Sequence, residues 1–242
     1  ELPAAMADQQ AVEGRKALEQ LVRTLPLAHG LKINIEVLAG ALDEITIDHA
    51  EKWDADLVVI GKHRRDVFLD LFRGSTGERI IRFGSRPILV AKTFAARPYV
   101  TGLAGVDFSQ PCQKAIEFAL RLVPNLDLQL THAFDIPFSG LLFGGRPIDQ
   151  VAKKHQQQFQ AMIQQQVAQF VRELGKPLDT SRLIAREGRP EEVILDVIGQ
   201  NRPDLLIIGT HGRSGLSRTL LGSVTEAMLA RAPCDVLAVR AW

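Results

Sequence analysis

The stretch Leu205-Leu206-Ile207-Ile208-Gly209-Thr210-His211-Gly212 decides the fold class. Its four consecutive apolar residues show no polar alternation, which is typical of a strand buried on both faces of a parallel sheet. Further apolar runs of strand length lie at 99–106, 127–133, 183–186 and 236–240. Helical patterns separate these runs, so the sequence predicts an α/β protein with a doubly wound, parallel, five-stranded sheet covered by helices.

The predicted helices have recognisable beginnings. Ser109 and Pro111 suit the cap and the first turn of a helix. Residues 149–174 carry apolar side chains three to four positions apart, which predicts a long amphipathic helix. Another helix is predicted to open at Pro190-Glu191-Glu192, because acidic side chains favour a helix N-terminus, and a short one at Ser223.

The composition excludes several classes of function. The chain has 29 basic and 28 acidic residues, and a net charge of +1 attracts it neither to nucleic acid nor to an anionic membrane. No apolar run reaches the length of a transmembrane helix. Cys112 and Cys234 match no metal-binding or redox spacing and are expected to be reduced and buried. We therefore expect a soluble cytoplasmic protein without a nucleic-acid or membrane partner.

An internal repeat divides the chain. When Asp56 is placed on Asp204, the two halves align without a gap from Gly40/Gly188 to Lys92/Arg240. Matched pairs include Ile60/Ile208, Gly61/Gly209, His63/His211, Gly74/Gly222 and Ser75/Ser223. A period of this length indicates a duplicated domain rather than small stacked repeats. We predict two tandem copies of one fold, at residues 1–96 and 97–242.

The first copy is predicted to be incomplete. Glu1 aligns with Asp149, so the first half has no counterpart of residues 100–148, where the first strand, first helix and second strand are expected. The predicted strands Ile33–Leu38 and Leu57–Ile60 would then enclose a hole with unpaired backbone groups. We expect the natural protein to have further residues before Glu1, whose elements are deleted here, disordered or supplied by another chain.

A glycine-containing loop carries the candidate chemistry. Gly209 is followed by Gly212 and, after nine intervening residues, by Gly222-Ser223, which opens a helix. Ligands of α/β sheets sit beyond the carboxyl ends of the strands, and glycines let a backbone approach them closely or adopt a positive φ. A helix N-terminus with a hydroxyl is an anion site. Asp107, at the end of the first predicted strand of the second copy (residues 99–106), is placed to accept hydrogen bonds from adenine or ribose. The spacing is neither a Walker A loop nor a Gly-x-Gly-x-x-Gly turn.

Asp107, the glycine loop and the stretch Pro233–Val239 resemble the universal stress protein family, and the glycine spacing resembles that of its ATP-binding branch. This resemblance implies an adenine nucleotide alpha hydrolase-like fold in both copies and a bound ATP, ADP or AMP with possible Mg²⁺. It implies contacts from Asp107 to the base or ribose, from Ala133 to adenine, from Gly209 and Gly212 to ribose and phosphates, and from Gly222, Ser223 and the Val224 amide to phosphates.

The first half departs from the family pattern. Arg64 stands where the second half has Gly212, and its side chain would crowd the phosphate path. We expect this half not to bind ATP and to act structurally. The resemblance implies that the last strands, Ile88–Lys92 and Val236–Arg240, pair edge to edge, either within one chain as a pseudo-dimer or in a homodimer.

The sequence leaves three functions open: a nucleotide-dependent sensor of the stress response, a slow ATPase or autophosphorylating enzyme, and a nucleotide-independent scaffold. Arg213 and Arg218 could meet phosphates, and Ser223 could help to bind Mg²⁺. No acidic pair or base is evident near the loop, so binding is favoured over turnover and no catalytic residue is assigned. Asp107 has a second interpretation, as a helix-capping acid beside Ser109, and the loop glycines could serve only a tight turn.

Overall fold

The computed structural model describes residues 4–25, 30–61, 76–93, 97–135, 149–175, 178–179, 182–210 and 221–240. Side chains 4–8, 76 and 149–160 lie outside this description. Several residues singled out from the sequence also lie outside it: Arg64, Gly74, Ser75, Gly212, Arg213 and Arg218.

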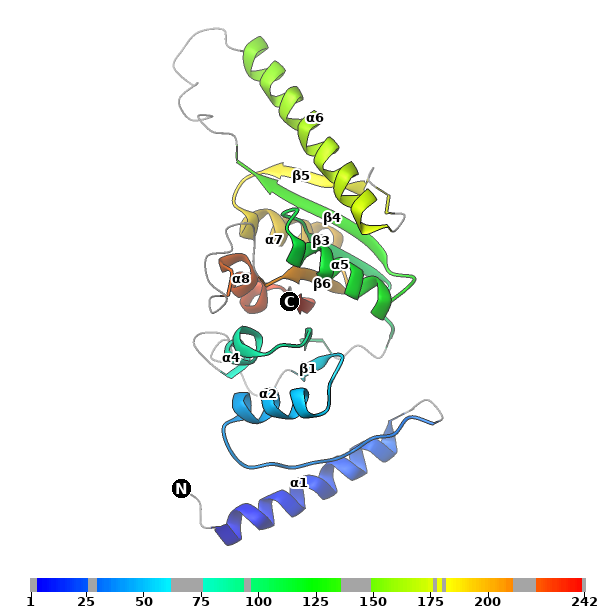
Figure 1. The fold of residues 1–242 in the computed structure, drawn as a ribbon, viewed down its shortest axis with the longest axis vertical. Helices are drawn as coiled ribbons and strands as arrows, with labels where there is room; N and C mark the ends of the chain where they lie inside the picture. Colours follow the sequence, from blue (N-terminus) through cyan, green and yellow to red (C-terminus); the bar gives the residue numbers. More distant parts are fainter. Residues whose placement is uncertain are drawn as a thin grey trace.

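The described strands form one seven-stranded sheet in the order β1-β2-β7-β6-β3-β4-β5 (Figure 1). The strands are β1 (Val58–Gly61), β2 (Ile88–Ala91), β3 (Thr101–Gly105), β4 (Asp127–Phe134), β5 (Ile184–Glu187), β6 (Leu205–Gly209) and β7 (Asp235–Val239). All neighbouring pairs are parallel except β2 and β7. The last five strands of the chain therefore form the predicted parallel sheet, with the doubly wound order 3-2-1-4-5.

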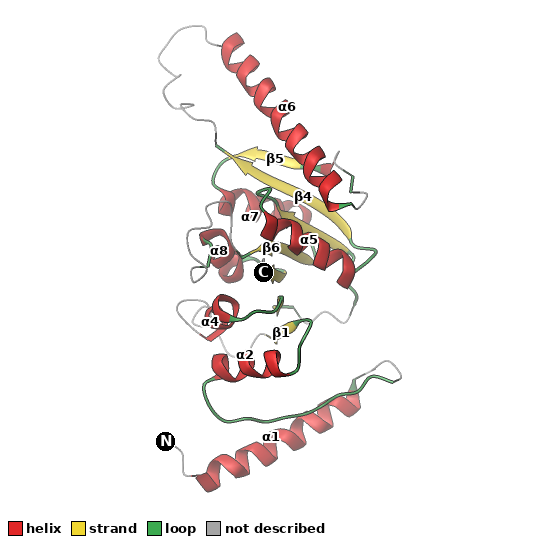
Figure 2. Ribbon diagram, in the orientation of Figure 1, coloured by secondary structure: helices red, strands yellow, loops and turns green. Residues whose placement is uncertain are grey.

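Helices cover both faces of the sheet (Figure 2). They are α1 (Ala4–Thr24), α2 (Leu42–Lys52), α4 (Thr76–Phe83), α5 (Gln110–Leu122), α6 (Asp149–Leu174), α7 (Pro190–Asn201) and α8 (Ser223–Arg231). The bounds of α6 are the predicted ones, and α7 and α8 begin at the predicted residues. Ser109 caps α5, as expected, because its side chain accepts a hydrogen bond from the Cys112 amide.

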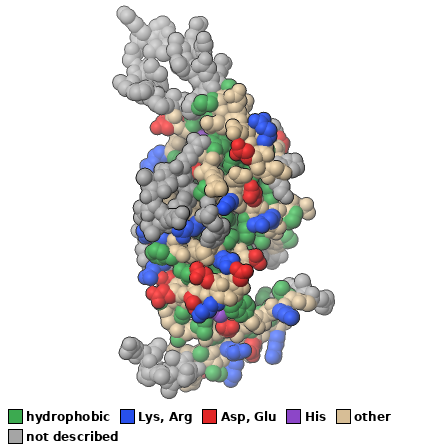
Figure 3. Space-filling model, in the orientation of Figure 1, with side chains coloured by type: hydrophobic (Ala, Val, Ile, Leu, Met, Phe, Trp, Pro, Cys, Tyr) green, Lys and Arg blue, Asp and Glu red, His purple; other side chains and the backbone are tan. Residues whose placement is uncertain are grey.

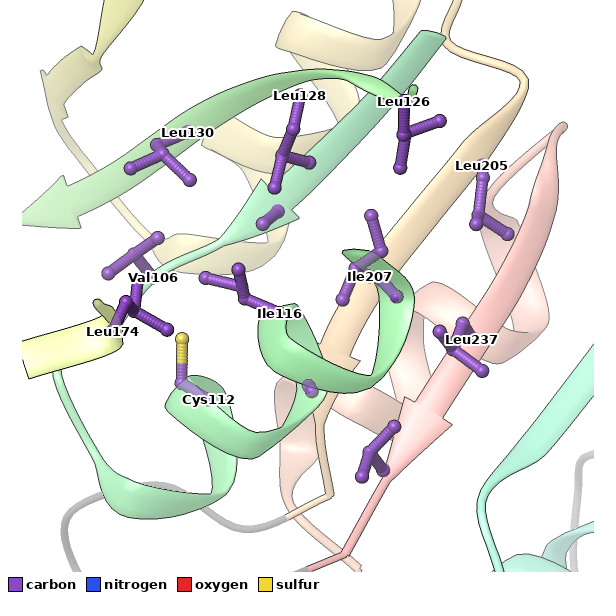
Figure 4. Packing of buried hydrophobic residues seen from close by; sticks show 14 of the residues in the cluster. Val106, Cys112, Ile116, Leu126, Leu128, Leu130, Leu174, Leu205, Ile207 and Leu237 are labelled. Atoms are coloured by element: carbon purple, nitrogen blue, oxygen red, sulfur yellow. The ribbon is translucent and has the colours of Figure 1, made fainter. Parts of the chain in front are cut away.

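Alternate side chains of each central strand enter different cores. On β6, Leu205 and Ile207 pack with α5 and α6, whereas Leu206 and Ile208 pack with α4, α7 and α8. Figure 4 shows Ile116 of α5 in the same cluster of buried side chains as Leu130 and Ile207. Such two-sided burial requires the unbroken apolar run from which the fold class was predicted.

The two halves of the chain join through their last strands. β2 and β7 pair antiparallel, with Leu89 opposite Leu237, which confirms the intramolecular edge-to-edge pairing. Asp235 strengthens this junction, because its buried carboxylate accepts hydrogen bonds from the Lys92 and Thr93 amides. A homodimer remains a prediction.

The predicted strand Ile33–Leu38 is wrong. Residues 31–39 belong to no strand, and Ile33 and Leu38 are exposed. Their counterpart in the second half includes β5, which forms its ladder with β4. The described part of the first half has no strand that corresponds to β4, and an extended segment without a neighbour cannot satisfy its backbone groups through a ladder.

Charged side chains of both signs are interspersed on the face shown in Figure 3, in agreement with the balanced composition. Among the described helices, none has the length and apolar character needed to cross a membrane.

Candidate functional site

A cavity of about 140 Å³ lies at the carboxyl ends of β3, β4 and β6. This is where the strand order reverses, because the connections from β3 lead to β4 on one side and from β5 to β6 on the other. The cavity is lined by Gly105, Val106, Asp107, Thr131, His132, Ala133, Pro190, Ile194, Ile208, Gly209 and Val224. Its lining is mostly apolar, with polar side chains from the ends of β3 and β4, as in typical small-molecule sites.

Asp107 follows β3 and is half-buried at the cavity. Its Oδ1 accepts hydrogen bonds from the Ser109 amide (3.0 Å) and the Ser109 hydroxyl (2.6 Å). Phe108 between them adopts a left-handed φ of 61°, which folds the chain back so that these bonds form. Asp107 therefore holds Ser109, the residue that caps α5, and does not itself bond to an amide of the helix. Its Oδ2 has no hydrogen-bond partner in the described chain, so one oxygen is available to a ligand.

The end of β4 forms the opposite wall of the cavity. Ala133, the predicted adenine contact, lines it, and its small side chain leaves room beside the strand. His132 points to the other side of the sheet, where its ring contacts Phe108 with centroids 4.6 Å apart. His132 Nδ1 lies 2.7 Å from the Val106 carbonyl oxygen. Since a carbonyl only accepts, Nδ1 carries the hydrogen, and this bond ties β4 to the end of β3.

Gly209 ends β6 and lines the cavity, and the packing of α5 requires a glycine at this position. A Cβ atom there would lie 2.9 Å from both the Cys112 amide nitrogen and the Pro111 carbonyl carbon. Its φ is not in the left-handed region. Gly209 therefore admits the start of α5, a packing role that the sequence did not indicate, and its contact with ribose and phosphates stays a prediction.

The N-terminus of α8 borders the cavity through Val224. Gly222 donates its amide to the Thr210 carbonyl (3.0 Å), so this predicted phosphate contact is used within the loop. The amides of Ser223, Val224 and Thr225 bond to no described acceptor, as expected for the first turn of a helix. These three donors, aligned with the helix dipole, favour an anion.

One acidic side chain does lie at this terminus, contrary to the expectation from the sequence. Glu191 of α7 places Oε1 3.2 Å from the Ser223 hydroxyl oxygen. The two residues lie 32 positions apart, so only the packing of α7 beside α8 brings them together. The carboxylate can repel a phosphate or share a cation with it.

The predicted site residues thus fall into three groups. Asp107, Ala133, Gly209 and Val224 line one cavity, and Gly222 and Ser223 lie next to Val224 at the start of α8. Gly212 and Arg213 lie outside the described residues. Sequence reasoning missed Thr131, Ile194 and Glu191. The alternation of β4 places Thr131 on the same side as Ala133 and could have revealed it, whereas no local signal marks the other two.

The cysteines do not contribute chemistry to the site. Both are free and buried, as predicted. Burial raises the pKa of the Cys112 thiol to about 12, which outweighs any lowering by the start of α5. Cys112 is therefore a packed thiol with little thiolate character.

A larger hollow of about 500 Å³ lies at the opposite, amino edge of the sheet. It is lined by residues that precede β3, β6 and β7, including Tyr99 and Asp204. Asp204 already accepts hydrogen bonds from the Val100 and Thr101 amides and pairs with Arg97. The Asp204 carboxylate is thus used by the fold itself. Because ligands of such sheets bind at the carboxyl edge, this hollow is not the candidate site.

The sheet order and the carboxyl-edge cavity define an α/β protein of the adenine nucleotide alpha hydrolase-like fold. A family model described as "Universal stress protein family" matches residues 1–92 and 101–240. The chain belongs to this family.

Two curated relatives and one solved structure illustrate the similarity. A universal stress protein of Mycolicibacterium smegmatis is 24% identical over 98% of this chain and 80% of its own length. Universal stress protein MJ0531 of Methanocaldococcus jannaschii is 30% identical over 55% of this chain and 78% of its own length. The crystal structure of a universal stress protein from Archaeoglobus fulgidus superposes with a TM-score of 0.64 at 17% identity, over 99% of this chain and 80% of that one.

Two more distant structures contain adenine nucleotides. One is a universal stress protein in complex with cAMP (20% identity, TM-score 0.40, covering 60% of this chain and 98% of that one). The other is an Arabidopsis thaliana family protein with AMP bound (20% identity, TM-score 0.37, covering 58% and 91%). These TM-scores are too low to carry a ligand assignment to this chain.

Proposed function

We propose that this chain binds an adenine nucleotide at the carboxyl edge of β3, β4 and β6, with the base in the cavity and the phosphates toward the N-terminus of α8. One observation carries the proposal. Asp107, Ala133, Gly209 and Val224, chosen from the sequence as nucleotide contacts, line a single cavity although they come from four separate places in the chain.

The size of the cavity supports this placement of the ligand. About 140 Å³ is less than the roughly 300–1,000 Å³ of pockets that enclose a whole drug-sized molecule. It suits one flat ring system rather than an entire nucleotide. The ribose and phosphates would then lie at the sheet edge, where Oδ2 of Asp107 and the first-turn amides of α8 lack described partners.

Along the sheet edge, the polar groups of the protein follow the order of the groups of a nucleotide. A carboxylate oxygen at Asp107 suits the hydroxyl donors of a ribose, and the α8 amides suit the oxygens of a phosphate. A nucleotide laid from the cavity across this edge would meet an apolar wall, then an acceptor, and then a group of donors. We assign ATP or a related adenine nucleotide to the second half, whose occupancy would act as a signal in the stress response by changing shape or assembly.

Glu191 favours one alternative, slow hydrolysis or autophosphorylation. Its carboxylate beside the Ser223 hydroxyl could help to hold a Mg²⁺ ion carried by the nucleotide. Rapid phosphoryl transfer also requires a positioned base and charge-neutralising groups. We therefore favour binding over turnover. A Glu191→Gln variant that keeps nucleotide affinity but loses a measurable wild-type ATPase rate would establish the alternative.

The test is equilibrium binding of adenosine, AMP, ADP and ATP, with the guanine series for comparison. The affinity should rise from adenosine to the phosphorylated ligands, and guanine nucleotides should bind more weakly. Asp107→Asn removes one charged acceptor and should weaken every adenine ligand by about tenfold, since hydrogen bonds to charged groups contribute about 1.5–3 kcal/mol. Asp196→Asn, on the exposed side of α7, is the matched control and should bind like the wild type. Equal affinities for all bases would contradict a built adenine site.

A further inference from the structure

One fully buried side-chain oxygen in the cavity wall has no hydrogen-bond partner among the described residues. Thr131 is 1% exposed and lines the cavity, and its Oγ1 is buried without a partner in the described chain. A buried hydroxyl in this state destabilises the folded protein, because it has lost its bonds to water. Valine has the same shape and would avoid the loss. The hydroxyl at this position therefore calls for a partner that the folded chain itself does not provide.

Thr131 lies deeper in the sheet than the other contacts on β4. Leu128 and Leu130 face the α5–α6 core, so Thr131 faces the opposite side together with Ala133. Two residues along a strand span about 7 Å, which places Thr131 that much further from the carboxyl edge than Ala133. The phosphate-binding end of the site, at α8, lies at the edge. The part of a nucleotide that reaches Thr131 is therefore the base.

The surroundings of this hydroxyl are apolar. Gly105 is the register partner of Thr131 on β3, and Ile194 lies directly over it, since a Cβ at Gly105 would lie 3.1 Å from Ile194 Cδ1. Ile208 lines the same wall. A polar group in a mostly apolar part of the wall fixes the orientation of a ligand, because few other groups there compete for the polar atoms of the ligand.

We propose that Thr131 Oγ1 is the hydrogen-bond partner of the polar edge of the adenine base, which makes Thr131 a specificity-determining residue of this site. The inference rests on the proposed function. The hydroxyl can donate to a ring nitrogen of adenine or accept from its exocyclic amine. Rotation about χ1 is enough to move Oγ1 into the position of the γ-methyl group.

The experiment compares Thr131→Val with Thr131→Ser in two measurements: calorimetric titration with AMP, and thermal unfolding without nucleotide. Valine keeps the shape and removes the orphaned hydroxyl, so its melting temperature should equal or exceed that of the wild type. Its Kd for AMP should rise about three- to tenfold, the usual effect of one lost neutral hydrogen bond. Serine keeps the hydroxyl and loses a buried methyl group, so it should melt below the wild type and bind AMP more tightly than the valine variant does.

We therefore expect the valine variant to have the higher melting temperature and the serine variant to bind AMP more tightly. A Thr131→Val protein that binds AMP like the wild type would overturn this inference and leave the proposed function intact. A Thr131→Val protein that loses stability would show a structural role and would also overturn it. Ribose 5-phosphate, used as a competitor, should bind all three proteins equally, and weaker binding to the valine variant would assign the contact to ribose instead. Wild-type protein that binds no adenine nucleotide would refute the proposed function and this inference with it.

Discussion

Substitution of Gly209 by Ala should disturb both stability and the nucleotide site. The new Cβ would lie 2.9 Å from the Pro111 carbonyl carbon and the Cys112 amide nitrogen, and both are backbone atoms that cannot rotate away. Either β6 or the start of α5 must shift. Overpacking of this kind costs about 1–3 kcal/mol. For a chain of this size each kcal/mol lowers the melting temperature by about 2–4 °C, so we expect a fall of about 2–12 °C.

The matched control is Gly199→Ala. Gly199 lies in the interior of α7, is exposed, and has no atom within 4 Å of the position that a Cβ would take. Alanine there should stabilise the protein by about 0.5–1 kcal/mol, because glycine is unfavourable inside a helix. Thermal unfolding followed by circular dichroism measures both variants, and AMP titration measures the site. A Gly209→Ala protein that melts and binds AMP like the wild type would show that this close approach constrains neither the fold nor the site.

Three further predictions concern charge and burial. Glu191→Gln should raise the affinity for Mg²⁺-free ATP roughly fivefold at low salt, because removal of one negative charge near a solvated surface contributes about 1 kcal/mol. Adenosine carries no phosphate, so its binding should not change, and an equal gain for adenosine would contradict the repulsion. The Thr101 and Val100 amides lower the pKa of Asp204, so the stabilising effect of its carboxylate is present at neutral pH and is lost as the pH falls below about 4. In urea unfolding, Asp204→Asn should be less stable than the wild type at pH 7, and the two stabilities should converge in acid. Stabilities that differ by the same amount at every pH would disprove the effect. The Cys112 thiol, whose pKa burial raises to about 12, should react with an aromatic disulfide reagent at pH 8 only after unfolding, and rapid labelling of the native protein would show that it is accessible.

The second half of the fold could be predicted closely from the sequence because its signals are local. The three-to-four spacing in residues 149–174 indicated the bounds of α6, and Pro190 and Ser223 marked the first residues of their helices. The apolar run before Gly209 identified a central strand through a requirement of the whole sheet, burial on both faces. These features depend on neighbours in sequence or on the layer architecture alone.

The strand predicted at Ile33–Leu38 failed because a strand is a property of two segments. Its repeat counterpart includes β5, which exists by pairing with β4, and pattern matching between the halves transferred the strand without the partner. In the same way, the repeat showed that Gly209 matters but not why. The close approach of Pro111 depends on how α5 crosses β6, which the sequence does not state.

The candidate site was predictable where it follows the ends of strands. Asp107 was chosen because it follows a strand whose carboxyl end lies at the ligand-binding edge, whereas Ala133 came from the family resemblance; both line the cavity at that edge. Glu191 was missed because its relation to Ser223 depends on the packing of α7 beside α8. Thr131 reads as an ordinary strand residue until its burial and its missing hydrogen-bond partner are known.

The most direct test of nucleotide binding by the second half is calorimetric titration with ATP–Mg²⁺ of the wild type and of Gly212→Arg, which copies Arg64 of the first half. The account predicts one site per chain in the wild type and loss of that site in the variant. No heat and no competition by AMP, from folded protein free of carried-over nucleotide, would contradict it. A second site, or full binding by the variant, would contradict the assignment to the second half.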